Sequence, residues 1–372
     1  MTDITFNLDP EVILGMDTVN RAGTVCKAYG SRVLIAVEQQ LYANHTIDRL
    51  TTILEDSGIE AIVFDAIPAQ ATAEVAIKIA TLARGSRCSG IIGFGGLTTQ
   101  SIARLGAISS GSDLFDILEG KKPDVPFLPY SAIPTTLEDP FLFSSYFIAI
   151  DPRDRSVKLI KSPKGLCNAV IIDGTLGESI SKPEVFAFDG LCTALEAYCS
   201  RKAGILSDVL LEQAIARYAR ISAGNADNVA EDFINAGFFL ALGTSVSAPG
   251  IGTALAYALN GRFSVEKCRC STVLLPAIVE RLITVRPEKI AKAAALMGME
   301  PGASVADSAT LALDAIRRRM EDLTVPRTLK EFGLALDRLV PVAEIARNLE
   351  FVAFSPWTIT THEVYDMLKL VF

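Results

Sequence analysis

The spacing of apolar residues changes once along this chain of 372 residues, near Pro183, and this change constrains the fold more than any other feature. Before Pro183, short apolar runs alternate with segments of helical periodicity. After it, apolar residues recur three and four positions apart, as in residues 206–221 and 305–320. The chain is long enough for two cores, so we predict an α/β domain over residues 1–180 and an all-helical domain over residues 181–372.

The first half of the chain predicts a parallel sheet. The apolar, β-branched runs that indicate buried strands are residues 33–37, 61–65 and 90–94. Strands that alternate with helices through short connections predict helices on both faces of the sheet. Two further runs, residues 147–150 and 157–160, are close enough to form a hairpin, and another strand is expected at residues 170–173.

The composition excludes several classes of partner. The chain has 43 acidic and 35 basic residues, a net charge of −8, so it lacks the basic face that nucleic acid or an anionic membrane requires. The N-terminus lacks the pattern of a signal peptide, and no run reaches the roughly 18 apolar residues of a membrane span. We therefore expect a cytoplasmic protein that acts on a small molecule. The sequence leaves open whether it forms a homodimer.

The seven cysteines include no CxxC pair with metal-site spacing. Five of them are predicted to be reduced thiols in the core of a cytosolic protein: Cys26, Cys88, Cys167, Cys192 and Cys199. Cys268 and Cys270 form a CxC pair, but side chains two positions apart point in different directions. A structural role is therefore favoured over a metal site for this pair.

A glycine-rich turn follows the third predicted strand and opens a helix. Gly95 and Gly96 allow a pyrophosphate to approach the backbone, and the free N–H groups of a helix start, near Thr98, favour negative charge. Glu38 closes the first predicted strand, where a carboxylate can accept hydrogen bonds from a ribose and repels a 2′-phosphate. The turn therefore predicts an NAD site in preference to an NADP site. The alternative for Glu38 is a solvated carboxylate at a strand end.

Two segments of this half resemble motifs of the iron-containing (group III) alcohol dehydrogenases, a family with dehydroquinate synthase-like architecture. Residues 93–104 are similar to the family's GGGS-xx-D-xxK element. Residues 132–136 resemble its IPTT segment, which implies that Thr135 and Thr136 line the cofactor cleft. The family continues AGTGSE, whereas this chain continues with the bulkier LEDPFLF of residues 137–143.

Three segments of the second half resemble the helices that bind metal in the same family: AFDGLCTALEAYCS from Ala187, SAPGIGTALAYALNG from Ser247, and KCRCSTVLLPAIV from Lys267. In the family these helices deliver one Asp and three His to a divalent metal. The resemblance implies that Asp189 is retained, and that the His positions are occupied by Thr193, Thr253 and Lys267. It also implies an N-terminal α/β nucleotide-binding domain, an all-α C-terminal domain, NAD as the cofactor and an active cleft between the domains.

The substituted positions lead us to expect no metal at this site, because hydroxyls and an ammonium are poor partners for iron or zinc. A site rebuilt from Asp189 with Cys192, Cys268 or Cys270 is the less favoured alternative. In our first hypothesis, the protein is a metal-independent NAD(H)-linked oxidoreductase in which Lys267, Asp189, Thr193 and Thr253 are catalytic. In the second, it is a non-redox ligand-binding paralogue or a lyase-type enzyme, and the Asp–Lys pair is structural.

Overall fold

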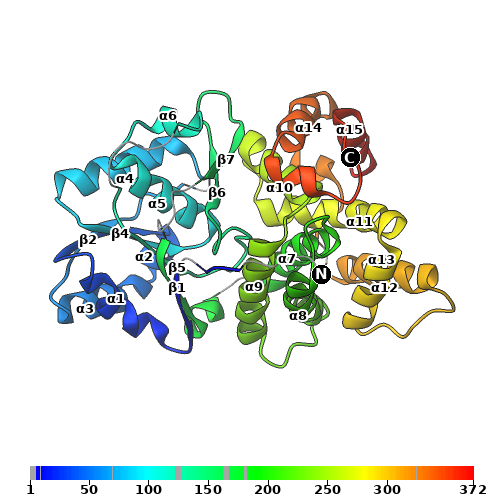
Figure 1. The fold of residues 1–372 in the computed structure, drawn as a ribbon, viewed down its shortest axis with the longest axis horizontal. Coiled ribbons are helices and arrows are strands. Elements are labelled where there is room, and N and C mark those ends of the chain that lie inside the picture. The colour runs from blue at the N-terminus through cyan, green and yellow to red at the C-terminus, as the bar shows by residue number, and fades with distance from the viewer. Residues whose placement is uncertain are drawn as a thin grey trace. The chain divides into compact units, whose positions relative to one another are not determined.

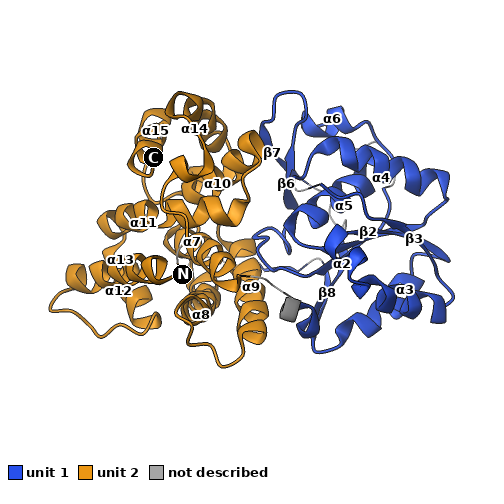
Figure 2. Ribbon diagram, turned by 180° about the vertical axis from the view of Figure 1, so that it is seen from behind, with its two compact units in different colours: residues 1–180 blue, residues 181–372 orange. Residues whose placement is uncertain are grey.

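The computed structural model describes residues 6–8, 10–68, 70–121, 127–161, 167–179, 182–323 and 325–372. The chain divides into two compact units, residues 1–180 and residues 181–372 (Figure 2). The first unit contains the strands, and none of the described residues from 182 onward forms a strand. The predicted fold class, an α/β unit followed by an all-α unit, is therefore confirmed.

The strands of the first unit are β1 (Glu11–Gly15), β2 (Arg32–Val37), β3 (Glu60–Phe64), β4 (Gly90–Gly95), β5 (Tyr130–Pro134), β6 (Tyr146–Ile150), β7 (Val157–Lys161) and β8 (Cys167–Asp173). Its helices, with 3-10 helices labelled η, are η1 (Thr18–Arg21), α1 (Ala22–Lys27), α2 (Gln39–Ala43), α3 (Thr46–Asp56), α4 (Ala73–Gly85), α5 (Leu97–Ser109), α6 (Leu114–Leu118) and η2 (Gly174–Ser179).

The main sheet has the strand order β1-β8-β5-β4-β2-β3, and all its pairs are parallel. Helices α4 and α5 lie on one face, and α1 and α3 lie on the other (Figure 1). Strands β6 and β7 form the predicted antiparallel hairpin as a separate two-stranded sheet. Strands β1 and β5 were not predicted: β1 is half exposed, and β5 ends in a proline.

The pattern of β2 explains why this sheet is buried on both faces. Val33, Ile35 and Val37 pack in one cluster with Leu50 and Leu54 of α3, and all five are fully buried. Alternate residues of a strand point to opposite faces, so the remaining apolar residues of β2 face the other layer of helices. A continuous apolar run is the pattern expected of a parallel strand covered on both sides.

The helices of the second unit are α7 (Pro183–Cys199), α8 (Ile205–Ser222), α9 (Val229–Val246), α10 (Ile251–Phe263), α11 (Lys267–Val285), α12 (Pro287–Leu296), α13 (Val305–Asp322), η3 (Leu329–Phe332), η4 (Leu336–Leu339), α14 (Val340–Arg347), η5 (Glu350–Phe354) and α15 (Thr361–Leu370). Helix α7 packs against α8, α9, α10 and α11. A helix surrounded in this way must bury every face, so any polar side chain on it needs a partner.

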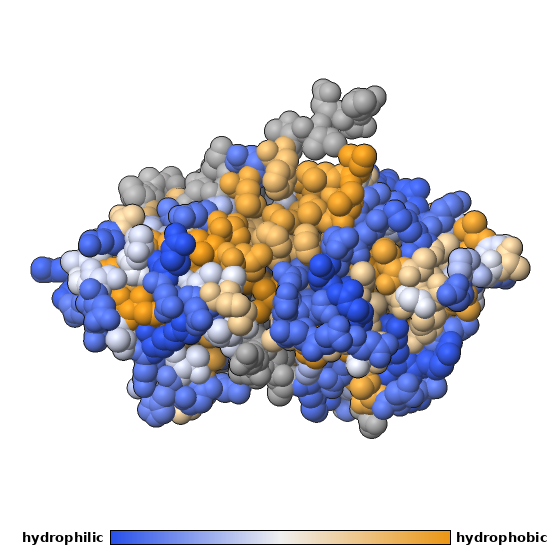
Figure 3. Space-filling view, turned by 90° about the horizontal axis from the view of Figure 1, so that it is seen from below, coloured by the Kyte–Doolittle hydropathy of each residue, from blue (hydrophilic) through white to orange (hydrophobic). Residues whose placement is uncertain are grey.

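No single helix among the described residues is long and apolar enough to span a membrane; α9 and α10 meet that test only when taken together across a bend of 108°. On the face drawn in Figure 3, hydrophilic residues and groups of apolar residues both reach the surface. The most exposed large hydrophobic side chains are Met16, Ile205 and Leu370, which belong to different elements. Single exposed residues of this kind are ordinary on protein surfaces.

Candidate functional site

The predicted cofactor-binding residues gather at one edge of the parallel sheet. The chain runs from β2 outward to β3 and then returns to β4 on the other side of β2, so the strand order reverses between β2 and β4. Glu38 follows β2, and Thr135 follows β5. Gly95 is the last residue of β4, and Gly96 directly precedes α5. Ligands of open α/β sheets bind at the carboxyl ends of strands where the order reverses.

The glycine turn is closely packed. Gly95 has a φ of +150°, which favours glycine, and a Cβ on it would lie 2.8 Å from Oγ1 of Thr99. A Cβ on Gly96 would lie 2.8 Å from Oγ1 of Thr136. Thr135 donates its backbone N–H to the Gly95 carbonyl at 3.2 Å. The turn therefore needs glycine at both positions and presents its backbone at the start of a helix, as a pyrophosphate site requires.

Glu38 contacts this turn directly, which was not predicted. Its Oε2 accepts a hydrogen bond from the N–H of Gly96 at 3.1 Å. Its own backbone N–H donates to the Phe94 carbonyl at 3.1 Å, which continues the pairing of β2 with β4. A hydrogen bond thus joins Glu38, the predicted partner of the ribose, to Gly96 in the predicted pyrophosphate site.

Gln100 is a residue of this edge that sequence reasoning missed. It lies in α5 with 4% of its surface exposed, and its Nε2 donates to the Gly93 and Gly95 carbonyls at 3.0 and 2.9 Å. Tyr130 donates its hydroxyl to Oε1 of Gln100. These bonds hold the end of β4 in place. The sequence feature that could have identified Gln100 is its position: it is a polar residue about one turn into the helix that follows the glycine turn.

The segment that departs from the family pattern is buried. Leu137, Phe141, Leu142 and Phe143 are each at most 6% exposed. Asp139, in their midst, caps the segment by accepting the N–H of Phe141 at 2.8 Å. The predicted bulky apolar loop is therefore a packed part of the structure.

The predicted catalytic residues come together within the helical unit, on three helices. Asp189 and Thr193 lie on α7, Thr253 lies on α10 and Lys267 opens α11. Asp189 and Thr253 are fully buried, Thr193 is 1% exposed and Lys267 is 5% exposed. We name these four residues the helical cluster.

Lys267 and Asp189 form the predicted ion pair. The Nζ atom of Lys267 lies 2.8 Å from Oδ1 and 2.7 Å from Oδ2 of Asp189. The same ammonium lies 5.0 Å from the ring centroid of Tyr257, one turn after Thr253 on α10. Both partners belong to the helical unit, within the residues 181–372 predicted for that domain.

A second set of contacts joins the two threonines to Glu196, whose role sequence reasoning missed. Thr193 and Thr253 place their hydroxyl oxygens 3.1 Å apart. Glu196, on α7, accepts the Thr253 hydroxyl at 2.8 Å and the backbone N–H groups of Gly250, Gly252 and Thr253 at 3.2, 2.6 and 2.9 Å. Its carboxylate therefore caps the N-terminus of α10.

Glu196 is 3% exposed, and burial raises its pKa above the ordinary range while its hydrogen bonds to α10 oppose that rise. All four contacts are donors to the carboxylate, which suits its ionised form. The signal in the sequence was a glutamate three positions after Thr193, on the same face of a helix that is otherwise apolar.

The helical cluster does not fit a divalent metal ion. Both oxygens of the Asp189 carboxylate already accept from an ammonium, and the two hydroxyls bond to each other. Burial and nearby carboxylates raise the pKa of Cys192 well above its usual value, and burial also raises that of Cys270, so both are held as thiols. Among the described residues, no three His, Cys, Asp or Glu side chains are grouped to hold a metal.

The two histidines and the seven cysteines lie outside any such group. His45 and His362 have side chains 80% and 82% exposed and lie beside Asp48 and Asp366, respectively. All the cysteines are free and buried, as predicted for five of them.

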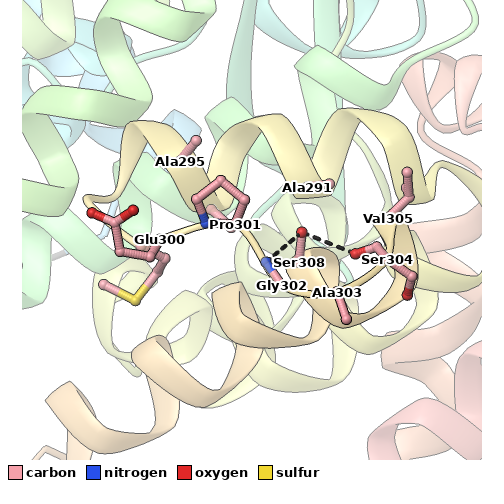
Figure 4. A pocket seen from close by; sticks show the side chains of 11 residues that line it. Ala291, Ala295, Glu300, Pro301, Gly302, Ala303, Ser304, Val305 and Ser308 are labelled. Atoms are coloured by element: carbon pink, nitrogen blue, oxygen red, sulfur yellow. Dashed lines mark hydrogen bonds between the residues drawn. The ribbon is translucent and has the colours of Figure 1, made fainter.

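A hollow of about 420 Å³ at the α12–α13 turn is a separate feature of the helical unit (Figure 4). Small apolar side chains line most of it, and Glu300 is its acidic residue. The Ser308 hydroxyl accepts the N–H of Gly302 and donates to the Ser304 carbonyl, both at 2.9 Å. These bonds shape the turn, and the lining offers no group of titratable side chains for chemistry.

Comparison with known proteins agrees with the fold and the motifs. The model of the iron-containing alcohol dehydrogenases matches residues 9–174, and that of the C-terminal domain of the Fe-containing alcohol dehydrogenase family matches residues 187–372. The chain belongs to the iron-containing alcohol dehydrogenase family. It therefore falls among alcohol-dehydrogenase-like oxidoreductases, and the predicted family resemblance is confirmed.

Individual family members are distant in sequence and close in fold. The 1,3-propanediol dehydrogenase of Citrobacter freundii is 25% identical over 348 residues, which cover 89% of this chain and 89% of that protein. A crystal structure of 1,3-propanediol oxidoreductase superposes with a TM-score of 0.91 over 100% of both chains at 22% identity. The sulfoacetaldehyde reductase of Bifidobacterium kashiwanohense, solved in complex with NAD+, has a TM-score of 0.85 over 100% and 99% of the chains at 15% identity.

Proposed function

We propose that this family member is a metal-independent, NAD(H)-linked oxidoreductase that acts on a small hydroxy or carbonyl compound, with Lys267 in place of the metal. The observation that carries the proposal is the ion pair of Lys267 with both oxygens of Asp189. An ammonium supplies positive charge for a substrate oxygen and also a transferable proton.

Lys267 is the most exposed residue of the helical cluster, at 5%, while Asp189 is fully buried. Bound NAD(H) would supply or accept the hydride. In reduction, Lys267 donates a hydrogen bond to the carbonyl oxygen and then its proton, which leaves a neutral amine. In oxidation, the amine takes the hydroxyl proton. Asp189 orients the ammonium and stabilises its charged form.

Thr193 and Thr253 supply hydrogen-bond acceptors rather than donors. The Thr253 hydroxyl donates a hydrogen bond to Glu196. The Thr193 hydroxyl is therefore the donor in its hydrogen bond with Thr253. The remaining lone pairs of the Thr193 oxygen can then accept a hydrogen bond from a water.

The cofactor part of the proposal rests on the carboxyl edge of the sheet. The pyrophosphate of NAD would lie over Gly95, Gly96 and Thr98, with Thr135 and Thr136 beside it. Glu38 would accept from the ribose and disfavour NADP. The NAD+ complex of a protein with the same fold supports the choice of cofactor.

The test is turnover of small alcohols, beginning with 1,3-propanediol, by enzyme prepared with a chelator. We expect NAD-linked activity that ignores the chelator and is eliminated in Lys267→Ala. The matched control is Lys292→Ala, which removes a half-exposed lysine paired with Glu212 in the same unit. Full activity in Lys267→Ala would refute the role of Lys267. Tighter binding of NADPH than NADH would refute the cofactor preference.

One observation favours a second candidate, a non-redox ligand-binding protein or lyase-type enzyme. The polar groups of the helical cluster are paired with one another, as in a structural network. Complete failure to bind NADH in fluorescence titration would favour this second candidate over the first.

A further inference from the structure

Two carboxylates lie close to Gly96. Measured from the point that a Cβ on Gly96 would occupy, Oε2 of Glu38 lies 3.8 Å away and Oε1 of Glu138 lies 3.9 Å away. Gly96 is the residue before α5, so both carboxylates lie near the helix N-terminus, which attracts anions. The N–H of Gly96 already donates to Glu38 at 3.1 Å.

The two carboxylates reach Gly96 from the two strands that flank β4. Glu38 follows β2, and its backbone continues the pairing with β4. Glu138 lies beyond the end of β5, is half-buried, and accepts the Thr136 hydroxyl at 3.2 Å. Both charges are therefore attached to the strands that form the cofactor edge.

Their effect on a pyrophosphate follows from charge. The N-terminus of a helix attracts an anion with the equivalent of about half a positive charge. Two carboxylates at similar distance oppose it with two full negative charges, and partial burial weakens their screening by solvent. Glu38 has a compensating function if it accepts from the ribose. Glu138 lies in the segment that departs from the family pattern.

We propose that Glu138 lowers the affinity of the dinucleotide site for its cofactor. Its charge weakens the binding of the pyrophosphate, so that the cofactor is held loosely and exchanges between turnovers. This inference rests on the proposed function, because it takes NAD(H) as the occupant of the glycine turn. It predicts that removing the charge of one side chain of the site tightens binding, the reverse of the usual result.

The test is fluorescence titration of the full-length protein with NADH in the presence of a chelator. Glu138→Gln keeps the size and hydrogen-bonding capacity of the side chain and removes its charge. We expect it to bind NADH roughly tenfold more tightly than the wild type. Glu74→Gln, which removes an exposed charge on α4 of the same unit, is the matched control and should leave the affinity unchanged.

Two further measurements separate charge from packing. Adenosine has no phosphate, so its affinity, followed by thermal shift, should be equal in the wild type and Glu138→Gln. Added salt screens the repulsion, so it should improve NADH binding more in the wild type than in Glu138→Gln. Equal tightening for adenosine and NADH would overturn the electrostatic role.

The remaining outcomes distinguish the two proposals. If the wild type binds NADH and Glu138→Gln binds it no more tightly, the role of Glu138 is refuted and the proposed function stands. If neither protein binds NADH at millimolar concentration, the proposed cofactor is wrong and the role of Glu138 falls with it.

Discussion

The ammonium of Lys267 and the carboxylate of Asp189 satisfy each other in a region where both are almost fully removed from water, with side chains 4% and 1% exposed. Two charges buried together cost desolvation energy, which their attraction and hydrogen bonds offset. Either charge alone would be strongly unfavourable there. The stability of the helical unit is therefore coupled to this pair, whatever its role in catalysis.

Removal of the lysine should destabilise the protein. We expect Lys267→Met to lower the free energy of unfolding by about 3–5 kcal/mol, because it leaves the Asp189 carboxylate buried without its cation. Chemical denaturation measures the change. Glu60→Gln breaks the exposed pair with Arg32 and should have little effect. Equal stability of Lys267→Met and wild type would contradict the observed pairing.

Because Glu196 caps α10, a methyl group at Gly250 should lower the stability of the protein. A Cβ there would lie 2.6 Å from Oε1 of Glu196, so Gly250→Ala must displace the carboxylate from its donors. We expect a loss of about 1–3 kcal/mol in denaturant unfolding. In Gly85→Ala the new Cβ meets nothing within 4 Å, and that variant should be as stable as the wild type or more so.

Glu196 should also make stability depend on pH. Its pKa is raised in the folded protein above the ordinary value of 4.5, so its contribution to stability is fully present below pH 4.5 and is lost as the pH rises through the folded-state pKa. The unfolding free energy of wild type minus that of Glu196→Gln should therefore shift in favour of the wild type as pH falls from 7 to 4. A difference that is constant, or that moves the other way, would show that the pKa is not raised.

A side chain at Gly96 should eliminate cofactor binding. Valine there would carry its Cβ to within 2.8 Å of Thr136 Oγ1 and place further atoms where the pyrophosphate approaches the backbone. We expect no NADH binding by Gly96→Val in fluorescence titration, and normal binding by Gly85→Ala. Wild-type affinity in Gly96→Val would place the cofactor elsewhere.

Elemental analysis tests the metal prediction directly. The purified protein should hold no stoichiometric iron or zinc, because the helical cluster offers one carboxylate, two hydroxyls and an ammonium. About one metal ion per chain would overturn this prediction, and loss of that metal on chelation should then remove the activity.

The sequence by itself determined the two units, because periodicity is a local property. Apolar runs of strand length and the spacing of helical faces after Pro183 depend on neighbouring residues only. The glycine turn was predictable for the same reason, and so was the shared face of Asp189 and Thr193, four positions apart on α7. Two strands were missed: β1, which is half exposed at the edge of the sheet, and β5, which ends in a proline.

The partners of the buried polar groups were decided by the tertiary structure. Glu196 binds backbone groups of α10 that are 54 to 57 positions away in the sequence. Glu38 binds Gly96, which is 58 positions away, and Lys267 binds Asp189, which is 78 positions away. Of these contacts, family resemblance had led us to expect only the last. A polar group removed from water takes whichever donor or acceptor the packing of other elements brings near, and no local pattern records that choice.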